Sequence, residues 1–269
     1  MKLSLVKREE GKTSFKISNV DYVFCNTLRR LVMDEVPTLA VHNVEIRENS
    51  TALYDEVLAH RLGLMPIKTD LSSYRLPVSD EEIEMKNASC TLQINLKCEK
   101  QGVVYAHMAK SADPSCTFVY PDTPIVSLHL KQHDKLVNKQ ELDVQKVDLT
   151  MTAVMGQGKN HVKWSPGILT YREELKLNAP KGVNSELLIE KCVDGVFIEK
   201  AGKLSVNQDK VQTSNLVDYY LSLDNTLNVE STGDMICDLE LWGQLTDLEV
   251  LNSASDIMLN KIEEFGGLL

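Results

Sequence analysis

The chain has 269 residues, of which 43% are hydrophobic and 25% are charged, and its formal net charge is −10. This composition is ordinary for a globular protein, and the acidic balance counts against a free-standing nucleic-acid-binding protein, because such binding depends on neutralising phosphates. No apolar run approaches the roughly 18 to 20 residues that span a bilayer, and residues 1–12 carry charges where a signal peptide would be apolar. We therefore expect a cytoplasmic protein without membrane contact.

The N-terminal region predicts a β-hairpin followed by a helix. Residues 2–8 and 13–17 alternate apolar and polar side chains, with a glycine-containing turn between them. Ser18 or Asn19 can cap the helix, and Pro37 ends it, because the residue before a proline is pushed out of the helical region. One face of this helix is apolar and comprises Val20, Phe24, Leu28, Leu31 and Val32.

A strand over residues 38–47 and a second helix over about residues 51–62 follow. Asn49 and Ser50 are suited to cap this helix, and Gly63 can end it in a left-handed conformation. Its apolar face comprises Leu53, Val57 and Leu58.

The middle of the chain has the character of a sheet up to about residue 171. Residues 91–96 alternate so that Leu92, Ile94 and Leu96 share one face. Further strands are predicted over residues 103–108, 116–120, 125–130 and 147–155. Short apolar pieces then alternate with turns over residues 178–223, which indicates a small separate unit.

The C-terminal region predicts two more strands, over residues 227–229 and 236–241, and then the clearest helix of the chain. Thr246 and Glu249 form a capping box, in which each side chain can satisfy a free backbone N–H of the first turn. A seam with spacings of three and four follows and comprises Leu248, Leu251, Ser255, Met258, Ile262 and Phe265, widened by Ala254 and Ile257. Gly266 and Gly267 end the helix.

Two segments suggest chemistry only weakly. Glu56 and His60 lie one turn apart on the second helix, but a metallohydrolase motif needs two histidines, so a charged helix face is the simpler interpretation. Residues 156–159 read Gly-Gln-Gly-Lys, with one residue between the glycines, whereas a phosphate-binding loop needs four and a Ser or Thr after the lysine. This segment predicts a tight loop between strands.

The cysteines are scattered, at Cys25, Cys90, Cys98, Cys116, Cys192 and Cys237. They contain no CxxC pair, whereas zinc sites and iron–sulfur clusters normally show closely spaced ligands. We therefore expect buried free thiols in a reducing compartment.

Two helices are amphipathic, one near each terminus. Together their apolar faces provide more surface than is always needed to cover a small sheet. Each can cover the chain's own sheet, a partner's, or both. An apolar helix face that the chain does not cover requires another polypeptide, so the sequence predicts oligomerisation.

Five segments carry a resemblance to a known family: residues 26–30, 36–41, 60–67, 120–126 and 156–166. They read NTLRR, VPTLAV, HRLGLMPI, YPDTPIV and GQGKNHVKWSP. In this order they resemble the alpha-type subunits of RNA polymerases, in the form called D in archaea. The resemblance runs through nearly the whole chain.

The resemblance implies an α+β fold with a split dimerisation domain, formed by residues 1–48 and 224–269 at the two chain ends. It implies an inserted mostly-β domain at residues 49–177 and a ferredoxin-like insert at residues 178–223. It also implies a non-catalytic assembly subunit that pairs with small subunit L, joins small subunits N and P, and nucleates assembly of the large catalytic subunits. No sequence-specific nucleic-acid binding is expected.

The same resemblance implies which residues meet which partner. The interface with subunit L is expected to comprise Phe24, Leu28, Arg29, Arg30 and Leu31 with Leu248, Leu251, Met258, Ile262 and Phe265. Contact with a large subunit or the rest of the assembly is expected for Asp55, Glu56, His60 and Arg61.

Many archaeal members carry iron–sulfur clusters in the insert, which residues 192–220 resemble. Cys192 is the only cysteine of residues 178–223, and a cluster needs roughly three or four thiolates. We therefore expect a degenerate insert without a cluster. Cys90 and Cys98 are too few, and too far apart, for the zinc loop found in eukaryotic relatives.

Two other functions are possible in principle. One is an iron–sulfur redox protein built on the insert, which the missing ligand cysteines disfavour. The other is a free-standing enzyme that uses the loop of residues 156–164, for which nucleotide binding by the isolated chain would be the sign.

Overall fold

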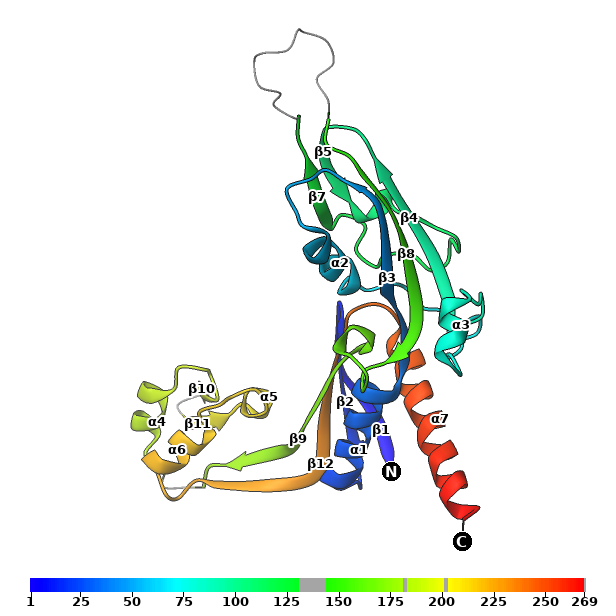
Figure 1. Cartoon of the computed structure of the whole chain (residues 1–269). Coiled ribbons are helices and arrows are strands. Elements are labelled where there is room, and N and C mark those ends of the chain that lie inside the picture. Colours follow the sequence, from blue (N-terminus) through cyan, green and yellow to red (C-terminus); the bar gives the residue numbers. More distant parts are fainter. Residues whose placement is uncertain (131–143, 181–182, 201–202, 269) are drawn as a thin grey trace. The chain divides into compact units, whose positions relative to one another are not determined.

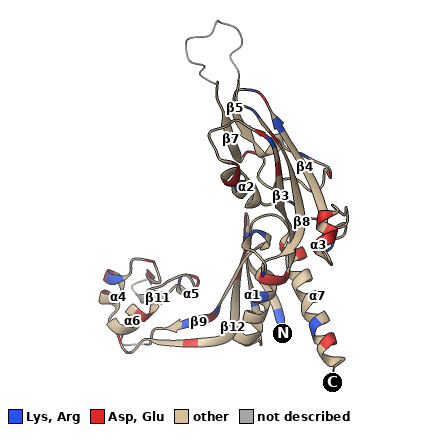
Figure 2. Cartoon of the chain, viewed as in Figure 1, with Lys and Arg blue, Asp and Glu red and all other residues tan. Residues whose placement is uncertain are grey.

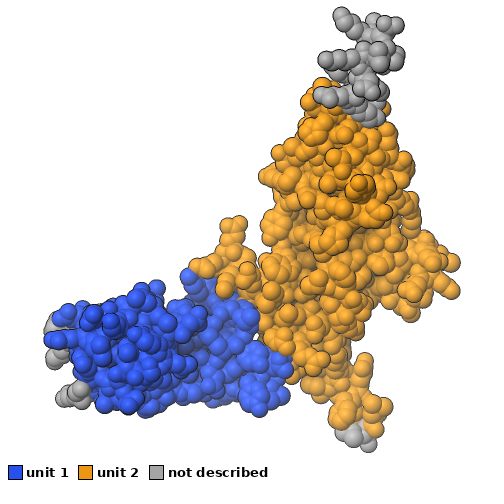
Figure 3. All heavy atoms as spheres, turned by 60° about the vertical axis from the view of Figure 1, so that its left-hand side comes forward, with its two compact units in different colours: residues 1–8, 13–26, 170–238 blue, residues 9–12, 27–169, 239–269 orange. Residues whose placement is uncertain are grey.

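The computed structural model describes residues 1–130, 144–180, 183–200 and 203–268 (Figure 1). Internal contacts divide the chain into two compact units (Figure 3). Unit 1 comprises residues 1–8, 13–26 and 170–238, and unit 2 comprises residues 9–12, 27–169 and 239–269. These limits differ from the predicted domain boundaries, which remain a prediction. Within the described ranges, no helix combines the length and the apolar character that crossing a membrane requires.

Unit 1 contains most of a four-stranded sheet, ordered β1-β2-β12-β9. The strands are β1 (Lys2–Glu9), β2 (Lys12–Ser18), β9 (Gly167–Asn178) and β12 (Asn228–Leu241). The predicted hairpin of β1 and β2 is confirmed, and Gly11 takes a φ of +73° in its turn. The two strands predicted before the C-terminal helix form one continuous strand, β12.

Helix α1 (Tyr22–Arg30) begins at a different residue from the one predicted. Asp21 Oδ1 accepts the Phe24 N–H at 2.9 Å, so Asp21 caps the first turn. The predicted caps Ser18 and Asn19 are therefore wrong: Ser18 ends β2, and Asn19 lies in the left-handed region with a φ of 59°.

After Arg30 the helix widens into a π-helical turn, Leu31–Glu35, which the sequence did not predict. There the Val36 N–H donates to Leu31 O at 3.1 Å, one residue farther back than in an α-helix. Pro37 then starts a strand, so the helix ends where the sequence predicted.

Unit 2 is built on an antiparallel sheet ordered β3-β8-β4-β6. The strands are β3 (Pro37–Asn49), β8 (Val147–Gln157), β4 (Thr91–Cys98) and β6 (Lys110–Ser111). The central strand β8 is buried along nearly its whole length, and β4 alternates as predicted, with Leu92, Ile94 and Leu96 in the core. The pairing of β3 with β8 slips between Val41 and Asn43, so that His42 is the extra residue of a β-bulge.

Helix α2 (Asp55–Gly63) buries Leu58 and Leu62 fully in the core of unit 2. It begins four residues later than predicted, because the Asn49 side chain holds a turn instead of capping a helix: it donates to Leu53 O at 2.9 Å and to Asp55 Oδ1 at 2.7 Å. The predicted left-handed Gly63 is also wrong, since Gly63 is the last helical residue and has no positive φ.

Three more differences concern the central region. The segment predicted as a strand over residues 116–120 forms only an isolated bridge, between Phe118 and Ile67. The strand predicted over residues 103–108 is a shorter strand, β5 (Gly102–Tyr105), followed by a 3-10 turn, and β5 pairs with β7 (Pro124–Leu128). An unpredicted helix, α3 (Asp80–Glu84), gathers acidic side chains (Figure 2).

The segment of residues 178–223 has its own apolar core, to which Leu188, Phe197 and Tyr220 contribute. Its elements are α4 (Ser185–Lys191), β10 (Phe197–Lys200), β11 (Lys203–Val206), α5 (Gln208–Val211) and α6 (Val217–Leu223). β10 and β11 pair antiparallel. Residues 187–189, one of the short apolar pieces of this segment, are thus helical.

A carboxylate joins three parts of this segment. Asp194 accepts hydrogen bonds from the Tyr220 hydroxyl at 2.7 Å, from the Val196 N–H at 3.3 Å and from the Ser214 hydroxyl. Burial raises the pKa of Asp194, but these hydrogen bonds outweigh it and leave the pKa lowered from its ordinary value. The ionised carboxylate is therefore the form that stabilises the fold here.

We expect Asp194→Asn to destabilise this segment by about 1 to 3 kcal/mol, because it replaces a charged acceptor by an amide whose NH₂ faces a hydroxyl donor, of Tyr220 or of Ser214, whichever way the amide turns. In the wild type, this contribution is present above the pKa of an unfolded aspartate and is lost as the pH falls through the lowered folded pKa. Hydrogen exchange of residues 185–223 measures both effects. Asp209→Asn, at an exposed position on α5, is the control. Equal exchange in the two variants would contradict the role of Asp194.

Candidate functional site

The C-terminal helix α7 (Asp247–Gly266) begins at the predicted capping box. The Glu249 N–H donates to Thr246 Oγ1 at 3.4 Å, and the Thr246 N–H donates to Glu249 Oε2 at 2.8 Å. Both halves of the box fix the start of the helix, and Gly267 follows its end, as predicted.

One side of α7 is attached to unit 2. Val250 and Ala254 are fully buried, and Lys261 forms an ion pair with Glu35 of the π-helical turn. These residues fall on one face of the helix. The opposite and neighbouring faces of α7 therefore point away from the unit.

The predicted seam lies on the neighbouring side of α7 and remains largely uncovered. Leu248, Ile262 and Phe265 are 71%, 59% and 64% exposed, and Leu251 and Met258 are half-buried. Leu259, which the sequence did not single out, adds a further exposed side chain. Large exposed apolar patches are typical of interaction sites on soluble proteins.

The predicted interface residues of α1 and its extension are placed differently. Leu28 and Leu31 are only 8% and 5% exposed, so they offer little surface to a partner, whereas Phe24 and Arg29 are half-buried and Arg30 is exposed. Their contact with a partner stays a prediction. The exposed apolar side chains of α1 are Tyr22 and Val23, which lie outside the apolar stripe that the sequence indicated.

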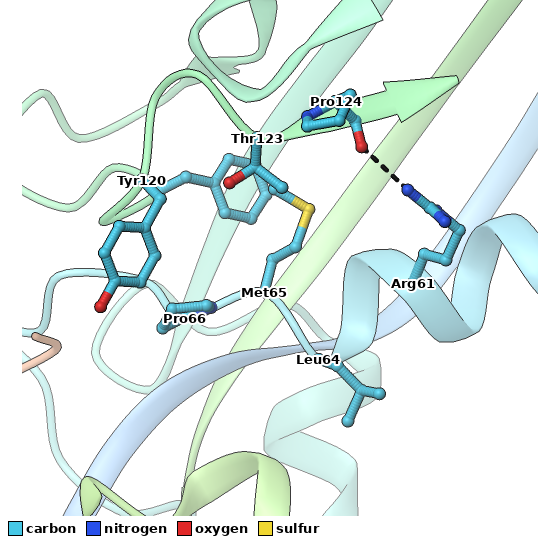
Figure 4. A pocket seen from close by; sticks show the side chains of 8 residues that line it. Arg61, Leu64, Met65, Pro66, Tyr120, Thr123 and Pro124 are labelled. Atoms are coloured by element: carbon cyan, nitrogen blue, oxygen red, sulfur yellow. Dashed lines mark hydrogen bonds between the residues drawn. The ribbon is translucent and has the colours of Figure 1, made fainter. Parts of the chain in front are cut away.

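The four residues predicted for assembly contact lie along α2. Asp55 and Glu56 are exposed in its first turn, where carboxylates favour the positive end of the helix dipole. His60 and Arg61 are exposed in its last turn, and Arg61 Nη2 donates to the Pro124 carbonyl at 2.9 Å (Figure 4). That hydrogen bond fixes the side of α2 that faces β7.

An apolar hollow of about 350 Å³ opens beside the end of α2 (Figure 4). It is lined by Arg61, Leu64, Met65, Pro66, Phe118, Tyr120, Thr123 and Pro124. Met65 and Phe118 are buried, while Leu64 and Tyr120 are about half exposed at its rim. Two segments that the sequence singled out, residues 60–67 and 120–126, thus meet at one surface.

Two more hollows adjoin it along α2. One of about 290 Å³ shares Arg61 and Pro124 with it, and one of about 200 Å³ shares Leu64. We call this region the α2 surface; it comprises the residues that line the three hollows. A concave surface that combines apolar side chains with several polar ones is suited to receive side chains of another molecule.

The loop of residues 156–164 serves packing. A Cβ at Gly156 would overlap the Trp164 indole, and one at Gly158 would lie 3.0 Å from the Met33 carbonyl carbon and closer still to its oxygen. The Lys159 N–H donates to Asp34 O at 2.9 Å. Gly156 therefore allows the Trp164 side chain to approach, and Gly158 allows the backbone of Met33 to approach, both within unit 2.

The cysteines do not fit an iron–sulfur cluster in the segment of residues 178–223. Its single thiol, Cys192, accepts the Phe197 N–H at 3.2 Å and lies 3.8 Å from the Tyr220 hydroxyl. Elsewhere, burial raises the pKa of the Cys237 thiol to about 12. Among the described residues, no three His, Cys, Asp or Glu side chains are grouped so that they could hold a metal ion.

Comparison with known proteins gives one consistent family. The family model described as the RNA polymerase Rpb3/Rpb11 dimerisation domain matches residues 14–262. DNA-directed RNA polymerase subunit Rpo3 of Methanothermobacter thermautotrophicus is 31% identical over 98% of this chain and 97% of its own length. The Rpo3 subunits of Methanosphaera stadtmanae and Pyrococcus horikoshii are 30% and 29% identical, each over 98% of this chain and 96% of their own length.

Proposed function

This chain belongs to the RNA polymerase Rpb3/Rpb11 dimerisation-domain family, and from that premise we propose that it is the non-catalytic assembly subunit of a DNA-directed RNA polymerase of archaeal type. It binds other subunits through its surfaces, while nucleotide addition takes place on another chain. We further propose that it acts in the cytoplasm.

The observation that carries this proposal is the exposed apolar seam of α7. Leu248, Ile262 and Phe265 lie uncovered beside a face that is attached to the chain's own unit 2. Burying such side chains against a partner contributes about 1.5 to 3 kcal/mol each. An obligate interface on the order of 2,000 Å² or more would remove them from water.

We propose that the α7 seam binds the small subunit L, with Phe24, Leu28, Arg29, Arg30 and Leu31 near that interface. The α2 surface, with Asp55, Glu56, His60 and Arg61, is proposed to meet a large subunit or the rest of the assembly, which includes small subunits N and P. Its hollows and the exposed Leu64 and Tyr120 support this assignment.

We also propose that the chain holds neither an iron–sulfur cluster nor zinc. The single cysteine of the segment of residues 178–223 supports the first. Cys90, which is fully buried and directly precedes β4, and Cys98, the last residue of β4, support the second, because the length of the strand separates them. Nothing in the donor set favours the redox alternative.

Native purification of the tagged chain from its own cells tests these proposals. Mass spectrometry should identify the two large catalytic subunits and an L-type small subunit in stoichiometric amounts, and the complex should incorporate nucleotides on a DNA template. Elemental analysis of the chain, expressed with subunit L alone, should find no iron or zinc. A chain that purifies alone would refute the assembly role, and stoichiometric iron would refute the cofactor proposal.

A further inference from the structure

The hollow of about 200 Å³ on the α2 surface has an unusual set of polar side chains. His42, His60, His161 and Lys163 line it, together with apolar residues and Gly63, and none of the described residues that line it is acidic. In a chain of net charge −10, this is a local concentration of groups that donate hydrogen bonds.

The backbone is shaped to build this site. His42 is the extra residue of the bulge in β3, so its side chain leaves the regular alternation of the strand. The bulge also leaves the Val41 carbonyl available, and Lys163 Nζ donates to Val41 O at 3.0 Å. Bulges are over-represented where a side chain must be re-aimed for function.

Lys163 is held in place without a charge partner. Its Nζ lies 3.4 Å from His42 Nδ1 and 4.4 Å from the centre of the Trp164 ring, which supplies a cation–π contact. Within the part of the chain that the structure describes, no carboxylate pairs with this ammonium group. Burial lowers the pKa of Lys163, so an incoming negative charge would restore the stability of the charged form.

The hydrogen bonds also set which ring nitrogens can act as donors. An ammonium can only donate, so His42 Nδ1 accepts from Lys163 Nζ, and His161 Nδ1 accepts the Lys163 N–H at 3.1 Å. In the neutral imidazole the other nitrogen, Nε2, then carries the proton. Both rings thus offer an N–H donor, which suits a ligand that only accepts.

The surroundings of the hollow indicate what carries that acceptor. Leu64, 48% exposed, lies on the rim shared with the apolar hollow of about 350 Å³. A free anion would use only the polar hollow, whereas a polypeptide can place an acidic and an apolar side chain in the two together. Charge complementarity and this adjacency favour a polypeptide, and the acidity of the chain disfavours a nucleic acid.

We propose that the hollow around Lys163 binds an Asp or Glu side chain of another polymerase subunit, whose neighbouring apolar side chain occupies the hollow beside Leu64. This inference rests on the proposed function and adds the chemistry of the contact. The carboxylate accepts from Lys163 Nζ and from the two imidazole N–H groups, which replaces the water they would otherwise bind.

A carbodiimide cross-link tests the contact directly in the assembled complex. The reagent activates a carboxylate, an adjacent lysine amine attacks it, and an amide forms while the carbodiimide takes up the oxygen to become a urea. No linker atoms are added, so only a carboxylate in direct contact reacts. Peptide mass spectrometry should find Lys163 joined to an Asp or Glu of another subunit.

Variants measure the strength of the contact. Reconstitution with the remaining subunits should be weakened about tenfold or more by Lys163→Gln, because a charge-assisted hydrogen bond is lost and a buried carboxylate is left unpaired. His42→Gln, whose amide keeps both an N–H donor and an acceptor, should weaken it less. Lys110→Gln, at an exposed position on β6, is the matched control and should change nothing.

The outcomes separate the inference from the assembly role. An intact complex in which Lys163 is not cross-linked to another subunit overturns the inference and leaves the assembly role standing. Cross-linking of Lys163 to nucleic acid by ultraviolet light would also overturn it. A chain that enters no complex refutes the assembly role and the inference together. The cross-linking experiment uses the wild-type chain, so a folding defect in Lys163→Gln does not affect its result.

Discussion

Replacing Ile262 by glutamate should abolish pairing with the L-type subunit while the free chain keeps its fold. Ile262 is 59% exposed, so a carboxylate there remains hydrated in the unpaired chain. In the interface the same group would be buried without a partner, which costs about 3 kcal/mol or more, a loss of at least about 100-fold in affinity. Size-exclusion co-elution and titration calorimetry with the purified L-type subunit measure the effect.

Asn260→Glu provides the matched control, because Asn260 is exposed on the same turns of α7 but on the side away from both the seam and the buried face. It adds the same charge to the same helix. Undiminished affinity of Ile262→Glu, or equal losses in the two variants, would show that the seam is not the interface.

Replacing Gly158 by alanine should destabilise unit 2 by about 3 kcal/mol, the upper end for overpacking. The added Cβ would lie 3.0 Å from the Met33 carbonyl carbon and 3.3 Å from Asp34 Cα, and backbone cannot move aside as a side chain can. The flanking bonds, Lys159 N–H to Asp34 O and Gln157 Nε2 to Glu35 O at 2.7 Å, hold the two segments at this separation. The melting temperature should fall by roughly 6 to 12 °C.

Gly266→Ala separates this steric effect from the general cost of losing a glycine. Gly266 is helical, and a Cβ there meets nothing within 4 Å. Its replacement should change stability by less than about 1 kcal/mol, in the stabilising direction. A melting temperature of Gly158→Ala equal to that of Gly266→Ala would refute the close-approach argument. Since Glu35 pairs with Lys261, Gly158→Ala should also weaken pairing through α7.

Local signals predicted α7 and β4 well. The capping box lies within four residues, and alternation over β4 reports its burial directly, with Ile94 and Leu96 at 1% and 0% exposure. The start of α1 was missed because Ser18, Asn19 and Asp21 are all suitable caps, and backbone geometry decides among them. The π-helical turn likewise has no sequence pattern of its own. Its extra residue is accommodated by tertiary packing, between the strand that starts at Pro37 and the loop of residues 156–164.

The candidate site was predictable only in part. Periodicity identified the stripes of α1 and α7, but it cannot tell a side chain buried in its own fold from one that awaits a partner. Leu31 and Ile262 have the same character in the sequence, and the structure leaves them 5% and 59% exposed. The hollow around Lys163 depends on a bulge and on residues 122 positions apart along the chain, which no local pattern encodes.

The last turns of α7 affect how stable the chain is toward proteases before it is assembled. Every residue from Leu259 to Leu268 is exposed, so after the contact of Lys261 with Glu35 the helix has little tertiary support. Helical turns with so little tertiary support unwind readily and are favoured sites of proteolysis. A copy whose α7 is not yet covered by another subunit would therefore be most sensitive to proteases in these turns.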